Sequence, residues 1–429
     1  MNKNFKLVAI VAVLVLLFAQ AVSAQDVEIR FTCYQDGNEC EVYSDLLDRF
    51  MADNEGISVV VDQVEYQAIL DSLPINVEVG EGPNIARVTN FTQLSEFYLD
   101  MRPLMADPSV LDDNYNAGVL GAFRADPMSD ALHGFTDALT VTGPFVNATL
   151  FEQAGIEIPA EGTTWEEWGV VLAEVAEATG VEYGFAIDNR GHRFAGPAMS
   201  SGATFFDEEG NFDLAGDEGF ESFAEILKTW LDDGLSPRET WATGDAYTAA
   251  NEYFVNVQTV MYFSGSWQIG NFSDTIGDAF DWVVVANPTG PGGSTGVAGG
   301  AAVVAFDTGD DAQNAATAAV MEFLAQPENV AEFSARTLNI PSNAAVVDMG
   351  VEFDSDNPQV VAALSQFAVE GGKLEDQAIA LTLHPFNFAY YGAGNTRLAQ
   401  YFAGEIDLSE VTTLIQSDID DAVANAGEE

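Results

Sequence analysis

Residues 137–168 read DALTVTGPFVNATLFEQAGIEIPAEGTTWEEW and combine a strand, a chain breaker and a helix start. The run 138–145 is apolar and β-branched, which predicts a strand. Its Gly143-Pro144 pair is predicted to end that strand, because proline cannot continue a central ladder. Farther on, Thr164 and Glu167 have the spacing of a capping box, which predicts the start of a helix. The stretch therefore indicates a narrow crossing that leads into a new part of the fold.

The chain begins with the pattern of a secretion signal. Lys3 and Lys6 precede the apolar run 7–18, and small residues follow at 22–24, so residues 1–24 are expected to be a signal peptide. This apolar run is too short for a membrane span, and no later run approaches the roughly 20 apolar residues that a span needs. We expect a soluble periplasmic protein. The expected cleavage site has no cysteine, so no lipid anchor is expected.

The charge of the chain is strongly negative. There are 14 Lys+Arg against 68 Asp+Glu, a net charge of −54; loss of two lysines with the signal leaves 12 against 68, or −56. Nucleic acid and anionic membranes need clustered basic residues, so both are excluded as partners. An acidic, well-solvated surface is the simplest interpretation. The acidic segment 207–211 lacks the spacing of a calcium loop and is predicted to be a hairpin turn.

Two cysteines, Cys33 and Cys40, are expected to form a disulfide in an oxidising compartment. A metal-binding or redox pair would more naturally have CxxC spacing with further ligands nearby, and the three histidines are scattered. The glycine-rich stretch 287–300 matches no phosphate-binding motif. No cofactor and no metal are expected.

The chain continues on both sides of residues 137–168 as alternating strands and helices. Segments 27–31, 43–50 and 57–61 have the periodicities of a strand, a helix and a strand, which predicts an α/β lobe with mainly parallel strands. The apolar run 282–286 and the segment 325–327 are predicted to be a second and a third crossing. Three crossings would make each of two lobes discontinuous in sequence.

Several segments, taken in order, resemble the extracellular solute-binding proteins that deliver sugars to ABC importers, the group that includes maltose-binding proteins. The segments are CYQDGNECEVYSDLLDRFMADNEGISVVV, GEGPNIARVTNF, TGPFVNATLFEQAGI with TTWEEW, VMYFSGSWQIGNF and MEFLAQPENVAEFSARTLNIPSNAA. The resemblance covers essentially the whole mature chain. It implies a periplasmic-binding-protein-like fold with two discontinuous α/β lobes, a multi-strand hinge and a ligand cleft between them. The N-terminal lobe is expected at 25–139 and 286–325, and the C-terminal lobe at 140–285 and 326–429.

The resemblance also implies a function. A sugar or small oligosaccharide is expected to be captured between the lobes and delivered to ABC transporter permease subunits by a monomeric, non-enzymatic protein. A sugar site combines aromatic platforms with planar polar groups. The positions that match such sites, or that follow strand ends, are Tyr34, Gln35, Asp36, Asn90, Asn189, Arg190, Trp241, Ser266, Trp267, Gly300, Phe386 and Tyr390, with Gln268, Gly299 and Tyr391 beside them.

Two alternatives stay open. The same fold could bind another solute such as a polyol, an osmolyte or an amino-acid derivative, although the scarcity of Lys and Arg disfavours anionic ligands. A secreted glycoside hydrolase would need a pair of carboxylates at a suitable separation, and no acidic pair stands out from the general background. The HExxH motif does not occur in the sequence.

Overall fold

The computed structural model describes residues 27–126, 128–242 and 247–426. The expected signal peptide, residues 1–24, lies outside these ranges. Of the helices described, none is both long and apolar enough to cross a membrane. The strands are β1 (Val27–Cys33), β2 (Ile57–Gln63), β3 (Ile85–Val88), β4 (Gly134–Asn147), β5 (Tyr183–Ile187), β6 (Thr259–Gly265), β7 (Trp282–Val284) and β8 (Ala298–Ala305).

Helices surround these strands. They are α2 (Glu39–Asp53), α3 (Tyr66–Glu78), α4 (Ser109–Asp112), α5 (Ala117–Gly121), α6 (Ala148–Ala154), α7 (Trp165–Thr179), α8 (Gly191–Ser200), α9 (Glu218–Asp232), α10 (Asn251–Val255), α11 (Gln268–Thr275), α12 (Asp311–Leu324), α13 (Pro327–Thr337), α14 (Ala344–Met349), α15 (Pro358–Gly371), α16 (Asp376–Leu383), α17 (Asn387–Ala403) and α18 (Leu408–Ala426), with 3₁₀ turns η1 (Ser95–Phe97) and η2 (Arg238–Trp241).

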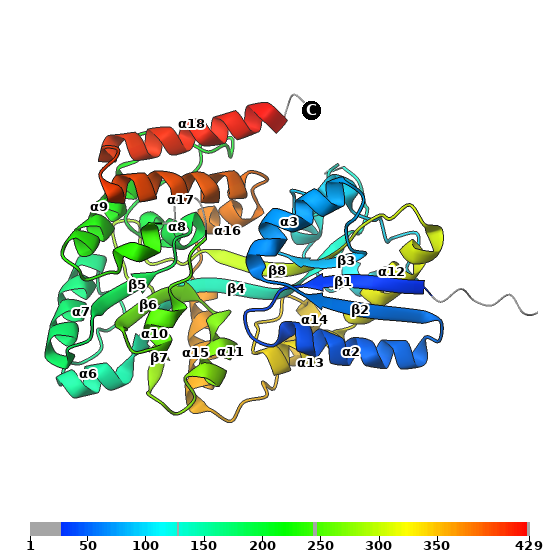
Figure 1. Cartoon of the computed structure of the whole chain (residues 1–429), viewed down its shortest axis with the longest axis horizontal. Coiled ribbons are helices and arrows are strands. Elements are labelled where there is room, and N and C mark those ends of the chain that lie inside the picture. The colour runs from blue at the N-terminus through cyan, green and yellow to red at the C-terminus, as the bar shows by residue number, and fades with distance from the viewer. Residues whose placement is uncertain (1–26, 127, 243–246, 427–429) are drawn as a thin grey trace, which may run out of the picture.

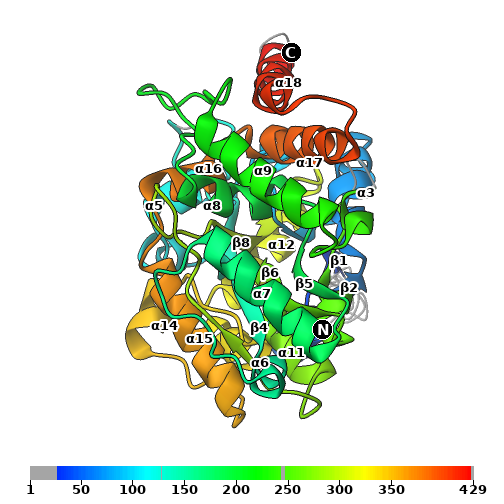
Figure 2. The same ribbon diagram turned by 90° about the vertical axis from the view of Figure 1, so that its left-hand side faces the viewer.

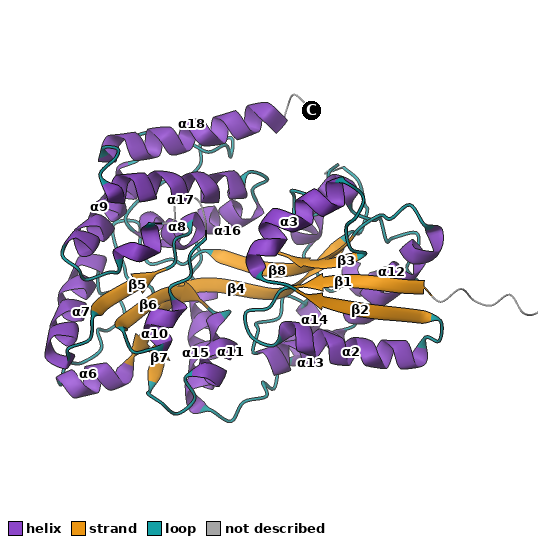
Figure 3. Cartoon of the chain, in the orientation of Figure 1, coloured by secondary structure: helices purple, strands orange, loops and turns teal. Residues whose placement is uncertain are grey.

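The eight strands that the structure describes form one mixed sheet that extends through two lobes (Figures 1 and 3). Its order is β2-β1-β3-β8-β4-β6-β5, and β7 pairs with β4 beside this path. Strands β1, β2 and β3 are parallel and lie in the first lobe; β5 and β6 are parallel and lie in the second. Strands β4 and β8 are antiparallel to each other and connect the two. The predicted fold class, two α/β lobes, is confirmed.

Strand β4 belongs to both lobes. Residues 134–141 pair with β8, residues 142–146 pair with β6 on the other side, and residues 145–147 pair with β7. The prediction that Gly143-Pro144 ends the strand is wrong. The carbonyl of Pro144 accepts a hydrogen bond from the N–H of Val285 at 3.3 Å, just beyond the end of β7. An N–H at position 144 would point to the same side, into the gap between the β8 and β7 pairings. The proline, which has no N–H, therefore removes no hydrogen bond from the ladder.

The first lobe is built on β1 and α2, which the Cys33–Cys40 disulfide joins. The predicted disulfide is thus confirmed, with 5.8 Å between the two Cα atoms. Buried side chains of β1 and α2, such as Phe31 and Leu46, share a core with α12 and with Phe333 of α13. This core fixes the direction in which the loop between β1 and α2 leaves the sheet.

The second lobe begins as the sequence predicts. The N–H of Glu167 donates to the Thr164 hydroxyl at 3.2 Å, and the N–H of Thr164 donates to the Glu167 carboxylate at 3.0 Å, so the capping box of α7 is confirmed. Trp165 and Trp168 are buried in the core of this lobe with Trp230. Figure 2 views the second lobe end-on, with α7 and α9 in front of β5 and β6 and with α17 and α18 above them.

The later crossings differ in detail from the prediction. Residues 287–293 still contact the second lobe, where the N–H of Gly292 donates to the carbonyl of Ser200, so the chain returns through β8 rather than at residue 286. The segment 325–327 is not a crossing, because α13 packs against α2 in the first-lobe core. The N–H of Ala344, at the start of α14, donates to the carbonyl of Asn114 of the same lobe. Helix α15 packs on β7 and β4, so the chain crosses between α14 and α15.

Candidate ligand-binding site

A cavity of about 370 Å³ lies where the two lobes face each other. The first lobe contributes the loop after β1, the start of α3 and the end of β3. The second lobe contributes the loops after β5 and β6 and the turn between α16 and α17. The connecting strands form the floor through Thr140, Gly299 and Gly300. Carboxyl ends of parallel strands meet at one edge of a sheet, which is why loops distant in sequence converge here.

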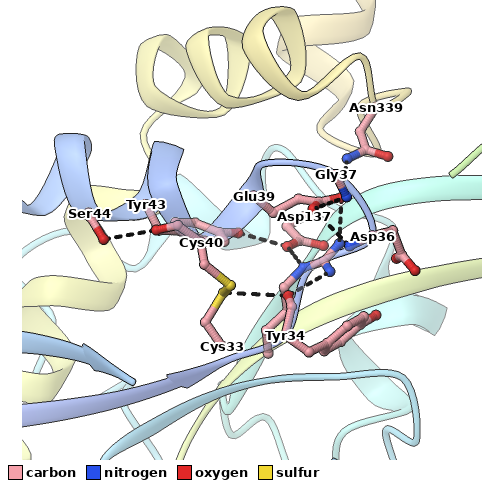
Figure 4. The surroundings of a disulfide bond; sticks show 11 residues. Cys33, Tyr34, Asp36, Gly37, Glu39, Cys40, Tyr43, Ser44, Asp137 and Asn339 are labelled. Atoms are coloured by element: carbon pink, nitrogen blue, oxygen red, sulfur yellow. Dashed lines mark hydrogen bonds and ion pairs between the residues drawn. A yellow bond between two sulfur atoms is a disulfide. The ribbon is translucent and has the colours of Figure 1, made fainter. Parts of the chain in front are cut away.

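A buried ion pair supports the first-lobe wall. Nε of Arg87 donates to Oδ2 of Asp137 at 2.8 Å, and the Tyr43 hydroxyl donates to the same oxygen at 2.7 Å. Glu39 lies 3.9 Å from the other side of the guanidinium. Burial alone would lower the pKa of Arg87, but the combined attraction of Asp137, Tyr34, Glu39 and Asp36 outweighs burial, so the pKa is raised and the residue stays charged. Figure 4 shows Glu39, Tyr43 and Asp137 packed around the disulfide and the Tyr34–Gly37 loop.

Asp36 is the carboxylate that this loop presents to the cavity. The N–H groups of Asp36 and Gly37 both donate to Oε2 of Glu39, at 3.0 and 2.9 Å, which fixes the loop over the start of α2. Enclosure between the lobes, followed by repulsion from Glu39, raises the pKa of Asp36 to about 7. Water still reaches the side chain. At neutral pH the carboxyl group can therefore both donate and accept hydrogen bonds.

Three tyrosines form a chain of ring contacts along one wall. The rings of Tyr34 and Tyr66 are 5.0 Å apart, and those of Tyr66 and Tyr247 are 5.8 Å apart in an edge-to-face arrangement. Tyr66 also shares a hydrogen bond of 2.9 Å with Thr89. Tyr66 belongs to the first lobe and Tyr247 to the second, so this contact joins the lobes across the cavity.

The second-lobe wall is organised by Asp188, a fully buried carboxylate. It accepts hydrogen bonds from Arg193 at 3.1 Å and from the Tyr262 hydroxyl at 2.7 Å. Arg193 also bonds Nδ1 of His192 at 2.8 Å, and Nε2 of His192 bonds the Ala298 carbonyl at 3.0 Å. Burial, with help from Arg193, lowers the pKa of His192 to about 3. The ring is thus neutral, with its proton on Nε2.

Trp267 lines the cavity, and its ring is 9% exposed. The Arg193 guanidinium lies 4.1 Å from the ring centroid. A Cβ on Gly265 would lie only 2.0 Å from the Trp267 ring, so the glycine makes room for it. Trp267 therefore supports Arg193 in addition to edging the cavity.

Arg190 faces the same cavity from the loop after β5 and is 8% exposed. Its guanidinium carbon lies 5.2 Å from the Phe388 ring centroid and 5.6 Å from that of Tyr391. Both rings come from α17, so a helix far along the chain holds the arginine in place. Such cation–π contacts stabilise a guanidinium without neutralising it.

The structure brings half of the predicted site residues to the cavity. Those that line it are Tyr34, Gln35, Asp36, Arg190, Trp267 and Gly300, with Gln268, Gly299 and Tyr391. Each of these residues lies in one of three places: directly after a strand of the central sheet, on a connecting strand, or on the cavity side of an adjoining helix.

The other predicted residues lie elsewhere, each with a structural role. The Asn90 carboxamide accepts hydrogen bonds from the N–H groups of Thr92 and Gln93 in a tight turn. Ser266 accepts one from the N–H of Val141 behind the cavity wall.

Four further predicted residues belong to the body of the second lobe. The Tyr390 hydroxyl donates to the Gly191 carbonyl. Trp241 packs on Phe402 at 4.9 Å. Asn189 is buried, and Phe386 packs against the lobe core.

Sequence reasoning missed several cavity residues, among them Arg87, Arg193, Tyr66 and Tyr247. The sequence could have identified Arg87, because a single charged residue within the buried strand IARV needs a buried partner. The contact between Tyr66 and Tyr247 depends on how the lobes meet, and no local sequence pattern predicts it.

Comparison with known proteins agrees with this architecture. The model of a family described as "Bacterial extracellular solute-binding protein" matches residues 45–362. No curated protein matches the sequence.

Solved structures match over nearly the whole chain. Maltose-bound MalE3 of T. maritima has a TM-score of 0.74 at 16% identity, over 92% of this chain and 100% of that one. The GacH receptor of Streptomyces glaucescens, solved unliganded and with acarbose, gives 0.73 at 18%, over 93% and 98%. An ABC substrate-binding protein of Listeria monocytogenes in complex with cycloalternan gives 0.71 at 16%, over 93% and 99%. At these identities the likeness shows the fold.

Proposed function

Because the chain belongs to the family of bacterial extracellular solute-binding proteins, we propose that it is the substrate-binding protein of an ABC importer and captures a saccharide between its lobes. The observation that carries the proposal is the cavity itself. Aromatic rings and hydrogen-bonding groups from both lobes line one enclosed space, as a ligand with an apolar ring face and many hydroxyls requires.

Two further points support a saccharide. Tyr34, Tyr66 and Tyr247 offer ring surface, while Gln35, Asp36 and Asn271 offer planar polar groups. The similar structures named above were solved with maltose, acarbose and cycloalternan. The predicted contacts of Tyr34, Gln35, Asp36, Arg190, Trp267 and Gly300 with ligand are part of this proposal.

We assign the lobes as the sequence suggests, 25–139 and 286–325 against 140–285 and 326–429, with two changes that follow from packing: α13 and α14 move to the first lobe, and residues 286–293 move to the second. Opening and closing would bend β4, β8 and the segment between α14 and α15. The closed, liganded form would be recognised by permease subunits outside the cytoplasm. No chemical step is part of the proposal, so ligand recovered after incubation should be unchanged.

The proposal is tested by thermal unfolding in the presence of a saccharide library. A ligand that binds only the native state stabilises it by about 2.7 kcal/mol at a hundredfold excess over Kd. Tyr66→Ala should weaken the stabilisation, whereas Tyr253→Ala, which truncates another half-buried tyrosine outside the cavity, should leave it intact. Failure of every sugar to raise the unfolding temperature would refute the saccharide assignment; turnover of a glycoside would refute the non-enzymatic one.

A further inference from the structure

Arginine is unusually concentrated at the cavity. The chain has ten arginines among 68 acidic residues. Three of the ten, Arg87, Arg190 and Arg193, line this one space. Composition averaged over the chain therefore says little about the charge that a ligand meets.

Two of these arginines are already neutralised. Arg87 is paired with Asp137 at 2.8 Å, and Arg193 with Asp188 at 3.1 Å. Each carboxylate is buried and is held by further hydroxyl donors, Tyr43 for Asp137 and Tyr262 for Asp188. These two arginines thus belong to the walls.

Arg190 differs from both. Within the described ranges, no carboxylate forms an ion pair with it, and no oxygen accepts a hydrogen bond from its guanidinium, although the residue is only 8% exposed. Its contacts are the rings of Phe388 and Tyr391. A nearly buried charge without a counterion is costly unless something else supplies the opposite charge. The open side of Arg190 is the cavity.

The carboxylates that face the cavity do not neutralise Arg190. Asp36 and Glu65 belong to the first lobe, and neither pairs with Arg190. A guanidinium presents a rigid fork of N–H donors that matches the two oxygens of a carboxylate or the oxygens of a sulfate. The cavity face of Arg190 therefore fits an anionic group on the ligand.

We propose that Arg190 binds the anionic group of an acidic saccharide, such as the carboxylate of a uronic acid unit, while the tyrosines and planar polar groups hold its rings and hydroxyls. The inference rests on the proposed function, because it takes the ligand to be a saccharide. It narrows the ligand class from sugars in general to sugars that carry negative charge.

The test is calorimetric titration with sugars that differ only at carbon 6. Methyl glycosides of glucose and glucuronic acid, the galactose and galacturonic acid pair, and the corresponding di- and trisaccharides supply matched probes. Glucose 6-sulfate distinguishes sulfate from carboxylate, and sodium acetate and sodium sulfate report binding of the anion alone. We expect the acidic member of at least one pair to bind roughly tenfold or more tightly than its neutral partner.

Variants identify the residue responsible. Arg190→Gln should abolish the preference for the acidic member, so that the two members of a pair then bind with affinities within about twofold of each other, and Arg190→Lys should retain part of the preference because it keeps the charge but loses the fork. Arg49→Gln is the control: it removes the same charge from α2, where Arg49 forms an exposed pair with Glu332 of α13. Circular dichroism and thermal unfolding verify that each variant is folded.

The outcomes separate the two proposals. Neutral sugars that bind as tightly as their acidic partners, or a preference that survives Arg190→Gln, would overturn this inference and leave the proposed function standing. Binding of acetate or sulfate through Arg190 without any binding of a saccharide would show a simple anion site. Absence of binding by every saccharide, neutral or acidic, would overturn the proposed function and this inference together.

Discussion

At the scale of single residues, the second-lobe wall depends on Asp188. This carboxylate is inaccessible to solvent and accepts hydrogen bonds from Arg193, Tyr262, Ser264 and the N–H of Ala250. One side chain thus fixes β6, α8 and the start of α10 relative to each other. Because Arg193 in turn bonds His192 and covers Trp267, the shape of this wall follows from a single buried charge.

Asp188→Asn should therefore be strongly destabilising. The substitution removes the charged partner of a nearly buried arginine and replaces one accepting oxygen by an NH2 donor that faces groups which all donate, so we expect the free energy of unfolding to fall by about 3 kcal/mol. Asp62→Asn is the matched control, because it breaks an exposed pair with Arg30 and should cost less than about 1 kcal/mol. Urea unfolding measures both; equal losses would contradict a central role for Asp188.

Asp36 makes a prediction about pH. Its pKa is about 7 in the folded protein against 3.8 in the reference state, so between these values the folded state binds more protons and stability rises as the pH falls. Asp36→Asn should remove this dependence. The variant should be more stable than wild type at pH 8, by less than about 1 kcal/mol because water screens the side chain, and should match it near pH 4. A difference that is constant from pH 4 to pH 8 would argue against the raised pKa.

Position along a strand was enough to predict from the sequence some of the residues that line the cavity. Tyr34, Gln35 and Asp36 follow β1 directly, and the ends of parallel strands converge on the cavity. Position did not separate Tyr390, which is buried in the second lobe, from Tyr391, which lines the cavity. Adjacent residues of a helix point about 100° apart, so one ring enters the core and the next faces the ligand space. The choice between them depends on the rotation of α17, which only packing determines.

At the scale of elements, the unit β1, loop and α2 places the cavity loop. The disulfide between Cys33 and Cys40 closes this loop, and residues 34–36 within it line the cavity. The same loop is held by Glu39 through two backbone N–H groups. Its shape is therefore fixed at both ends before any ligand arrives.

Replacing both cysteines with serine should reduce stability and affinity together. Loop-closure entropy for so short a loop predicts a loss of about 2.5 kcal/mol in the free energy of unfolding. Ligand affinity should fall as well, because Tyr34 and Asp36 lose their fixed positions. Wild-type protein treated with a reductant is the control and should behave like the double variant. An unchanged affinity with reduced stability would show that the disulfide does not order the binding loop.

Element prediction was good for periodic segments and weaker at junctions. The helix start at α7 was predictable because a capping box is a local device that two residues complete. The end of β4 was not predictable in this way. Pro144 lacks an N–H donor, and this lack is harmless only where two partner strands leave a gap. Pro327 suggested a crossing, yet it occupies the first turn of α13, a position that proline favours, and that helix returns to the first lobe.

At the scale of the whole molecule, two sets of contacts join the lobes around the cavity. The floor consists of β4 and β8, which pass continuously from one lobe to the other (Figure 1). On the opposite side, Tyr66 meets Tyr247, and the hydroxyl of Thr92 donates to the carbonyl of Pro385 at 3.3 Å. At the floor the polypeptide chain itself connects the lobes, whereas the contacts on the opposite side, the upper contacts, are few and weak. We therefore expect opening of the cavity to require only modest energy and to leave the core of each lobe intact.

This asymmetry predicts that the two upper contacts set the balance between open and closed forms. Tyr247→Ala combined with Thr92→Val should shift the ligand-free protein toward the open form and increase its radius of gyration in small-angle X-ray scattering. Saturating ligand should restore the wild-type value, because contacts in the cavity replace those that were removed. Apparent affinity should fall in proportion to the fraction of closed protein that is lost. The single variant Thr92→Val keeps the tyrosine contact and should lie between the two. If the double variant without ligand has the same radius as wild type, the lobes are held together by the connecting strands alone, and closure does not depend on the tyrosines.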